Sequence, residues 1–310
     1  MSRLPRLGFS GVLCVLAGCA STPPPVPFPA RDGELGRLTG TARAAFTEGS
    51  LPIAVRLYQQ ALTRARALDT ATEIGNTAYN LAACRIALGE YDGARELLDE
   101  AESELGRAKA NLADVLLLEA KLAHWQGRRD ATLRFAGRVL ADPASTPSPA
   151  HRAEVALLNG HLACDDREVA RAWEALAEAA QQNKAGADPA LLAGTERLRG
   201  RIFLLESNAG PAAGAFEREA AFFQKAQQPR EMARALMRAG EAWRDAGQPA
   251  PGAERYFRAA RSFFAQGDHA TAAKSVELSL ALAEAGFDAA LAHRARQLQA
   301  ELHKSAPAPH

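Results

Sequence analysis

Most of the chain repeats one arrangement of small and bulky residues with a period near 40. The clearest copy spans residues 78–101, AYNLAACRIALGEYDGARELLDEA. It predicts two helical segments joined by a tight turn, with Gly89 ending the first segment. Small residues lie where the two segments must touch: Ala82 on the first, Ala94 and Ala101 on the second. Helices reach the near end of their 8–10 Å packing range only with small residues at the crossing, so this pattern predicts a close helix pair.

The same register holds through seven units between residues 33 and 304. The positions equivalent to Ala94 are Ala54, Ala94, Thr132, Ala172, Ala212, Gly252 and Leu291. Twelve residues before them lie Ala42, Ala82, Ala120, Gly160, Gly200, Gly240 and Ser279, all small. Four residues after them lie Tyr58, Leu98, Ala136, Leu176, Phe216, Tyr256 and Ala295. Turns are expected at Gly49, Gly89, Gly127, Gly247 and Gly286, and at Asp165-Asp166 and Asn208-Ala209-Gly210. The pattern predicts an all-α fold of seven antiparallel helix pairs.

The A-x3-[FY]-x2-A spacing and the small residue and glycine of the first segment resemble a tetratricopeptide repeat. Each such pair leaves an apolar face that only its neighbour can cover, so the units must stack into an α-solenoid. Leu291 and Ala295 depart from the pattern in the last unit, which we interpret as a cap. The period exceeds the 34 residues usual for the family. HEAT and armadillo repeats, which run about 40–47 residues, therefore stay as the rival class.

Residues 1–18 are typical of a secretory signal. Arg3 and Arg6 form a basic segment, and residues 7–16 form an apolar run too short to span a bilayer. The run ends in Leu-Ala-Gly-Cys at residues 16–19, which resembles the lipobox of bacterial lipoproteins. A plain signal peptide with a chance cysteine is the alternative interpretation.

The lipobox resemblance implies that Cys19 is lipidated and becomes the mature N-terminus. Ala20 follows it, where the enterobacterial sorting rule places Asp to retain a lipoprotein in the inner membrane, so the outer membrane is implied, with the protein facing the periplasm. Residues 19–32 carry five prolines and predict an extended tether. Residues 305–310 predict a disordered tail.

The residues give little sign of catalysis. There is no nucleotide-binding loop, zinc-protease motif or nucleophile elbow in the sequence. His161 and Cys164 are three apart on one expected helix, and His124 and His161 are one repeat apart, but neither pair makes a convincing catalytic or metal site. Cys84 and Cys164 are two repeats apart and are expected to be buried thiols. We expect neither an enzyme nor a cofactor, and the net charge of +1 gives no support to nucleic acid as a partner.

The tetratricopeptide resemblance implies that the first helix of each pair lines a concave groove that binds extended or helical protein segments. The inward positions carried over are Asn76, Tyr79, Asp114, Lys121, His124, Glu154, His161, Arg197, Arg201, Arg234, Met237, Glu241 and Arg244. Four of these arginines are expected to converge on one strip, which suits an acidic partner segment. The tetratricopeptide and lipobox resemblances together imply a membrane-anchored periplasmic adaptor for a cell-wall, secretion or polysaccharide-export assembly. A direct binder of an anionic glycan or cell-wall fragment is the alternative.

Overall fold

The computed structural model describes residues 25, 27–28, 32–183 and 188–305. The expected signal peptide, the lipidated Cys19, most of the tether and residues 306–310 of the tail lie outside the described residues, so these expectations stay predictions.

Fourteen helices, and no strand, make up the described part of the chain. Their bounds are α1 (Gly33–Thr47), α2 (Leu51–Ala67), α3 (Ala71–Leu88), α4 (Tyr91–Arg107), α5 (Ala113–Trp125), α6 (Arg129–Ala141), α7 (Pro149–Asp165), α8 (Val169–Gln182), α9 (Pro189–Leu205), α10 (Ala209–Lys225), α11 (Pro229–Asp245), α12 (Pro249–Ala265), α13 (His269–Ala285) and α14 (Ala289–Ser305). The predicted all-α solenoid of seven helix pairs is confirmed.

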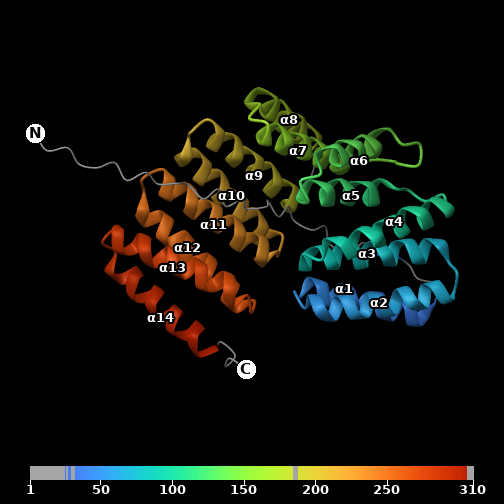
Figure 1. The fold of residues 1–310 in the computed structure, drawn as a ribbon, viewed down its shortest axis with the longest axis horizontal. Helices are drawn as coiled ribbons and strands as arrows, with labels where there is room; N and C mark the ends of the chain where they lie inside the picture. Colours follow the sequence, from blue (N-terminus) through green and yellow to red (C-terminus); the bar gives the residue numbers. More distant parts are fainter. Residues whose placement is uncertain (1–24, 26, 29–31, 184–187, 306–310) are drawn as a thin grey trace, which may run out of the picture.

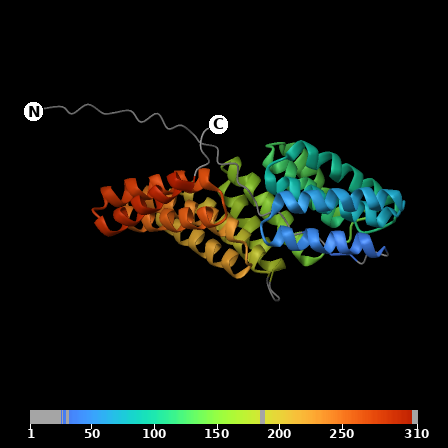
Figure 2. The same ribbon diagram turned by 90° about the horizontal axis from the view of Figure 1, so that it is seen from below.

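The seven pairs follow an arch (Figure 1). The chain rises from α1 and α2 through α6, crosses at α7 and α8, and descends through α9 to α14. A view from below shows the helices of the two halves on either side of the central pairs (Figure 2). Since α5 contacts α7 and α7 contacts α9, the first helices of the central pairs lie side by side.

Close crossing at the small positions is confirmed, and Gly200 shows it best. A Cβ atom placed on Gly200 would lie 2.5 Å from the ring of Phe216, which is 1% exposed. The same construction at Gly240 places Cβ 3.0 Å from the ring of Tyr256. The bulky residue of the second helix thus packs directly on the backbone of the first helix, which only glycine permits at this separation.

A left-handed residue recurs in the turns, nearly every twenty residues. Positive φ angles occur at Gly49, Asp69, Gly89, Lys109, Gly127, Arg167, Ser207, Gln227, Gly247, Gly267 and Phe287. This conformation lets the next amide reach back to the helix end, as when the Asp288 N–H donates to the Ala283 carbonyl over 2.8 Å. Gly286 lies in the expected turn, but its φ is −89°, and Phe287 takes the left-handed position at 56°. The left-handed residue is therefore fixed by its position relative to the helix end, and the residue at that position is not always glycine.

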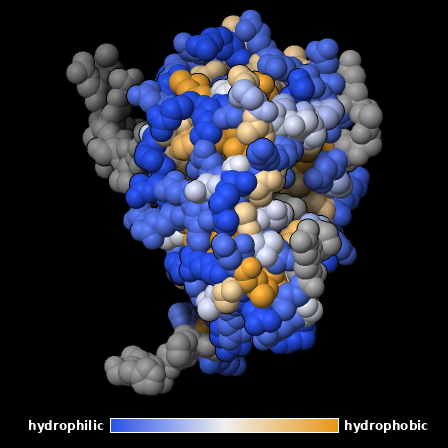
Figure 3. Space-filling model, turned by 90° about the vertical axis from the view of Figure 1, so that its right-hand side faces the viewer, coloured by the Kyte–Doolittle hydropathy of each residue, from blue (hydrophilic) through white to orange (hydrophobic). Residues whose placement is uncertain are grey.

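The surface at the α1–α6 end is mainly hydrophilic, with small hydrophobic patches separated by polar side chains (Figure 3). Among the described residues, none of the helices combines the length and apolarity needed to cross a bilayer.

Candidate functional site

Polar side chains on the central first helices pair across neighbouring helices, and we call this set the first-helix ladder. Helix α5 contributes Asp114, Lys121 and His124; α7 contributes His151, Glu154, His161 and Asp165; α9 contributes Arg201. Equivalent positions on adjacent first helices are about one repeat apart, so the repeat itself brings these residues into register. The ladder therefore follows directly from the 40-residue period.

Two polar contacts join α5 to α7. The Nε2 atom of His151 lies 2.9 Å from Oδ1 of Asp114, and Lys121 Nζ lies 2.9 Å from Glu154 Oε1. The Lys121 side chain is 5% exposed, whereas Glu154 is 29% exposed. The ammonium group is thus removed from solvent with its counter-charge beside it, and the carboxylate remains accessible from the surface.

His161 connects all three helices. Its ring stacks on His124 of α5 with centroids 6.0 Å apart, and Nη1 of Arg201 on α9 donates to its Nδ1 over 3.0 Å. Nη2 of Arg201 also donates to Asp165 over 2.6 Å. Burial lowers the pKa of His161 well below its usual value, and the positive charge of Arg201 lowers it further. His161 is therefore neutral, and its Nδ1 is the hydrogen-bond acceptor that Arg201 requires.

A small cavity opens beside the ladder between α5, α7 and α9. Its lining includes Lys121, Glu154, His161, Gly194 and Arg197, and its volume is about 30 Å³. That space matches about one water molecule. Small-molecule sites are typically ten or more times larger. The ladder is consequently suited to contact along its surface, and it does not enclose a small ligand.

Arg197 belongs to a buried ion-pair network rather than to an open groove. It is 5% exposed, and its Nε donates to Glu219 of α10 over 2.6 Å. Glu219 is fully buried and also accepts from Arg238 of α11 over 2.6 Å. Glu231 joins Arg197, at 3.5 Å, to Arg234, at 2.7 Å. The expected convergence of Arg197 and Arg234 is therefore real, but their charges are neutralised by carboxylates of the same chain.

The remaining arginines point elsewhere. Arg201 reaches back toward α7, as described above, and Arg244 pairs within α11 with Glu241 at 3.4 Å and Asp245 at 2.8 Å. The expectation of one accessible strip of four arginines is thus wrong for Arg197, which is buried, and for the other three it stays a prediction. Whether Glu241 and Arg244 contact a partner stays a prediction.

Tyr79 on α3 was expected in the groove and lies beneath it. It is 4% exposed and belongs to the hydrophobic core. Burial raises its pKa, and the nearby carboxylates of Asp114 and Glu154 raise it further. Tyr79 therefore supports the ladder from below and is not accessible to a partner.

The cysteines behave as buried thiols. Cys84 and Cys164 are both free and buried, and burial raises the pKa of Cys84 to about 12. Burial also raises the pKa of Cys164, which opposes formation of a nucleophilic thiolate beside His161. Within the described ranges, no group of three or more histidine, cysteine or acidic side chains is placed to hold a metal ion.

Two residues of interest were not singled out from the sequence. His151 was missed because its role depends on a capping box with Ser148 as well as on Asp114. Glu119 on α5 is 5% exposed and has an Oε2 atom without a hydrogen-bond partner among the described residues. Burial raises its pKa to about 8, with the charges of Glu102 and Asp99 adding to the effect. A charged residue inside an otherwise apolar run was the available signal.

Comparison with known proteins identifies similar folds. No protein-family model matches the chain. No curated protein matches it either.

Solved structures do resemble it. The apo form of RapI aligns with 88% of this chain and 77% of its own, at a TM-score of 0.54 and 6% identity. A tetratricopeptide repeat protein from Parabacteroides merdae covers 86% of this chain and 99% of its own, at a TM-score of 0.44 and 14% identity. PilW, a type IV pilus biogenesis factor, covers 73% and 91%, at 0.49 and 17%. At these identities the likeness concerns the fold alone, and the fold is the stacked helix-pair solenoid described above.

Proposed function

We propose that the protein is a membrane-anchored periplasmic scaffold that binds a protein partner along the first-helix ladder and supports an envelope assembly. The observation that carries this proposal is the ladder itself. It presents ionisable groups in fixed positions along three helices, with no enclosed space for a substrate larger than water among the described residues that line it. Fixed polar groups on a rigid surface favour recognition of a complementary protein segment.

Several ladder groups are accessible to such a segment. The side chains of Asp114 and Asp165 are 52% and 49% exposed, and that of Arg201 is 32% exposed. Alternating charges of this kind select a partner by complementarity and add little to affinity individually. The partner is therefore expected to be an extended protein segment that contacts several groups of the ladder together. An acidic part of that segment would have to meet Arg201, because Asp114 and Asp165 repel it.

The test compares Arg201→Gln with Arg171→Gln. Both arginines form an ion pair, but Arg171 lies on the second helix α8, is 68% exposed and pairs with Glu168 beside its own helix. A tagged copy of each variant is recovered from detergent-solubilised envelope. Loss of a stoichiometric protein with Arg201→Gln, at unchanged helicity, is the expected result.

Equal recovery with both variants would place the partner site away from the ladder. Recovery of no stoichiometric protein by the unaltered chain would instead support direct binding of an anionic glycan or wall fragment.

A separate experiment tests the lipid anchor. Cys19→Ser removes the thiol that the lipobox interpretation requires, so the protein should move from the membrane fraction to the soluble periplasmic fraction with its fold unchanged. A substituted protein that stays in membranes would contradict the lipid anchor.

A further inference from the structure

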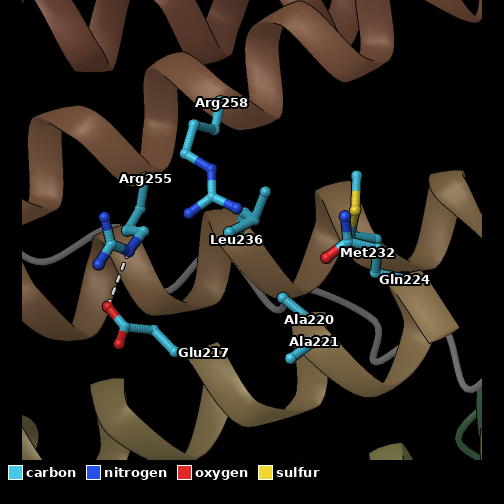
Figure 4. A pocket seen from close by; sticks show the side chains of 8 residues that line it. All are labelled: Glu217, Ala220, Ala221, Gln224, Met232, Leu236, Arg255 and Arg258. Carbon is cyan, nitrogen blue, oxygen red and sulfur yellow. Dashed lines mark hydrogen bonds and ion pairs between the residues drawn. The ribbon is translucent and has the colours of Figure 1, made fainter. Parts of the chain in front are cut away.

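A second cavity lies on the opposite, second-helix side of the C-terminal half, between α10 and α12 with α11 as its floor (Figure 4). We call it the second-helix cavity. It is lined by Glu217, Ala220, Ala221, Gln224, Met232, Leu236, Arg255 and Arg258. Its volume is about 170 Å³. This is below the range of about 300–1,000 Å³ for small-molecule sites, so it fits one or two side chains of a docked protein.

The floor of the cavity is apolar. Leu236 is 2% exposed, and Met232 is partly buried beside it. On the α10 side the wall is formed by Ala220 and Ala221, whose small side chains leave the space open. Methionine adapts its shape readily, which suits a surface that receives an apolar side chain.

The rim of the cavity has two arginines, and they differ in their partners. Arg255 donates to Glu217 over 2.7 Å, and Glu217 also accepts from the indole of Trp243 over 2.8 Å. The only carboxylate of the lining therefore accepts both hydrogen bonds at its Oε1 atom. Arg258, one turn further along α12, is exposed and forms no ion pair with any residue of the described chain.

Arg138 on α6 shows what Arg258 lacks. Arg138 occupies the repeat position equivalent to Arg258, and it pairs over 2.7 Å with Glu102 on the neighbouring second helix α4. The position on α10 equivalent to Glu102 is Ala220, in the wall of the cavity. This wall therefore offers Arg258 no carboxylate at that position, and the exposed guanidinium stands over an apolar floor.

We propose that the second-helix cavity docks a segment of a partner protein in which an apolar side chain and a carboxylate lie next to each other. The apolar side chain enters the cavity onto Leu236 and Met232, and the carboxylate accepts a forked hydrogen bond from Arg258. This surface is separate from the first-helix ladder, so the inference does not rest on the function proposed above. It would give the solenoid two contact faces at once.

Methionine methyl groups make the test specific. The chain has three methionines: Met1, Met232 in the cavity, and Met237, which lies on the same helix but outside the cavity lining. The full chain is labelled at its methionine methyl groups and titrated with an acetylated peptide that has Leu-Asp-Asp-Leu at its centre. A saturable shift of the Met232 signal, with Met237 unmoved, is expected.

Matched peptides and variants separate the two contacts. A Leu-Asn-Asn-Leu peptide removes the charge, and a Ser-Asp-Asp-Ser peptide removes the apolar side chains; each should bind about tenfold more weakly. Arg258→Glu should weaken binding of the first peptide by about tenfold or more, and Ala221→Glu should do the same by supplying an internal carboxylate. Arg95→Glu, at an exposed arginine on α4, is the charge-matched control and should leave binding unchanged.

Several outcomes would overturn the proposal. They are no saturable Met232 shift up to millimolar peptide, equal binding of the amide peptide, and binding that survives both Arg258→Glu and Ala221→Glu. A Met232 shift that grows with protein concentration alone would also overturn it, because a second copy of the chain would then be the occupant.

Discussion

Replacing Glu119 by glutamine should stabilise the protein, and the gain should grow with pH. Glu119 is buried on α5 with one oxygen unbonded among the described residues, and its pKa is raised to about 8 from an ordinary 4.5. Burial is the main cause, followed by the charges of Glu102 and Asp99. The folded chain therefore holds a proton that the unfolded chain releases, which costs stability as the pH rises.

The size of the effect follows from proton linkage. A group with a raised folded-state pKa contributes its full stability below pH 4.5 and loses it as the pH rises through about 8. Each pH unit in that window is worth about 1.4 kcal/mol, so the total cannot exceed about 5 kcal/mol. A glutamine side chain at this position would occupy a similar volume without a charge. The gain of Glu119→Gln should therefore be near zero at the acid end of the window and a few kcal/mol at the alkaline end.

Urea unfolding of both chains, followed by circular dichroism across this pH window, measures the difference. Glu96→Gln on α4 is the control, because Glu96 is exposed and should change stability by less than about 0.5 kcal/mol at every pH. A gain from Glu119→Gln that is the same at both ends of the window would refute the reasoning, because it would show that the charge of Glu119 is not what costs stability.

Three further perturbations test the fold. Gly200→Ala should destabilise by about 1–3 kcal/mol in thermal unfolding, because its Cβ would press on the Phe216 ring, whereas Gly137→Ala, with nothing within 4 Å, should not destabilise. Phe287→Gly should raise the free energy of unfolding by about 1 kcal/mol, since an exposed bulky residue leaves the left-handed region. Cys84 should resist thiol reagents until denaturant is added, as peptide mass spectrometry of labelled protein would show.

The architecture could be predicted because it is encoded locally and repeated. The spacing from Ala42 to Ala54 and Tyr58 recurs in each unit, so each of the seven pairs supports the same assignment of helices. The turns were less certain from the sequence. The position with a positive φ is set by its distance from the helix end, and Lys109, Arg167 and Phe287 take it without any residue signal.

The site could be predicted only in part. Five of the ladder residues on α5 and α7 were identified because the tetratricopeptide resemblance carries over the inward positions of each first helix, and His151 was missed. The five are Asp114, Lys121, His124, Glu154 and His161. The ion-pair partners of Arg197 and Arg201 could not be predicted, because they depend on which carboxylate lies within reach. Glu219, for example, reaches Arg197 from a second helix. The second-helix cavity was also beyond prediction, since it depends on the small side chains of Ala220 and Ala221 in the wall formed by α10.

The buried network of Arg197, Glu219 and Arg238 bears on how the chain avoids misalignment while it folds. Repeated alanine-rich helices offer several near-equivalent alignments, and sliding by one turn would bury a similar apolar surface. A slipped alignment of α9 on α10 would remove Arg197 from Glu219, which is fully buried, and a slip of α11 on α10 would remove Arg238. A lost buried partner costs about 3–5 kcal/mol, a large share of the stability of an ordinary domain. The network thus favours one alignment of the C-terminal helix pairs over alignments that are shifted by one turn.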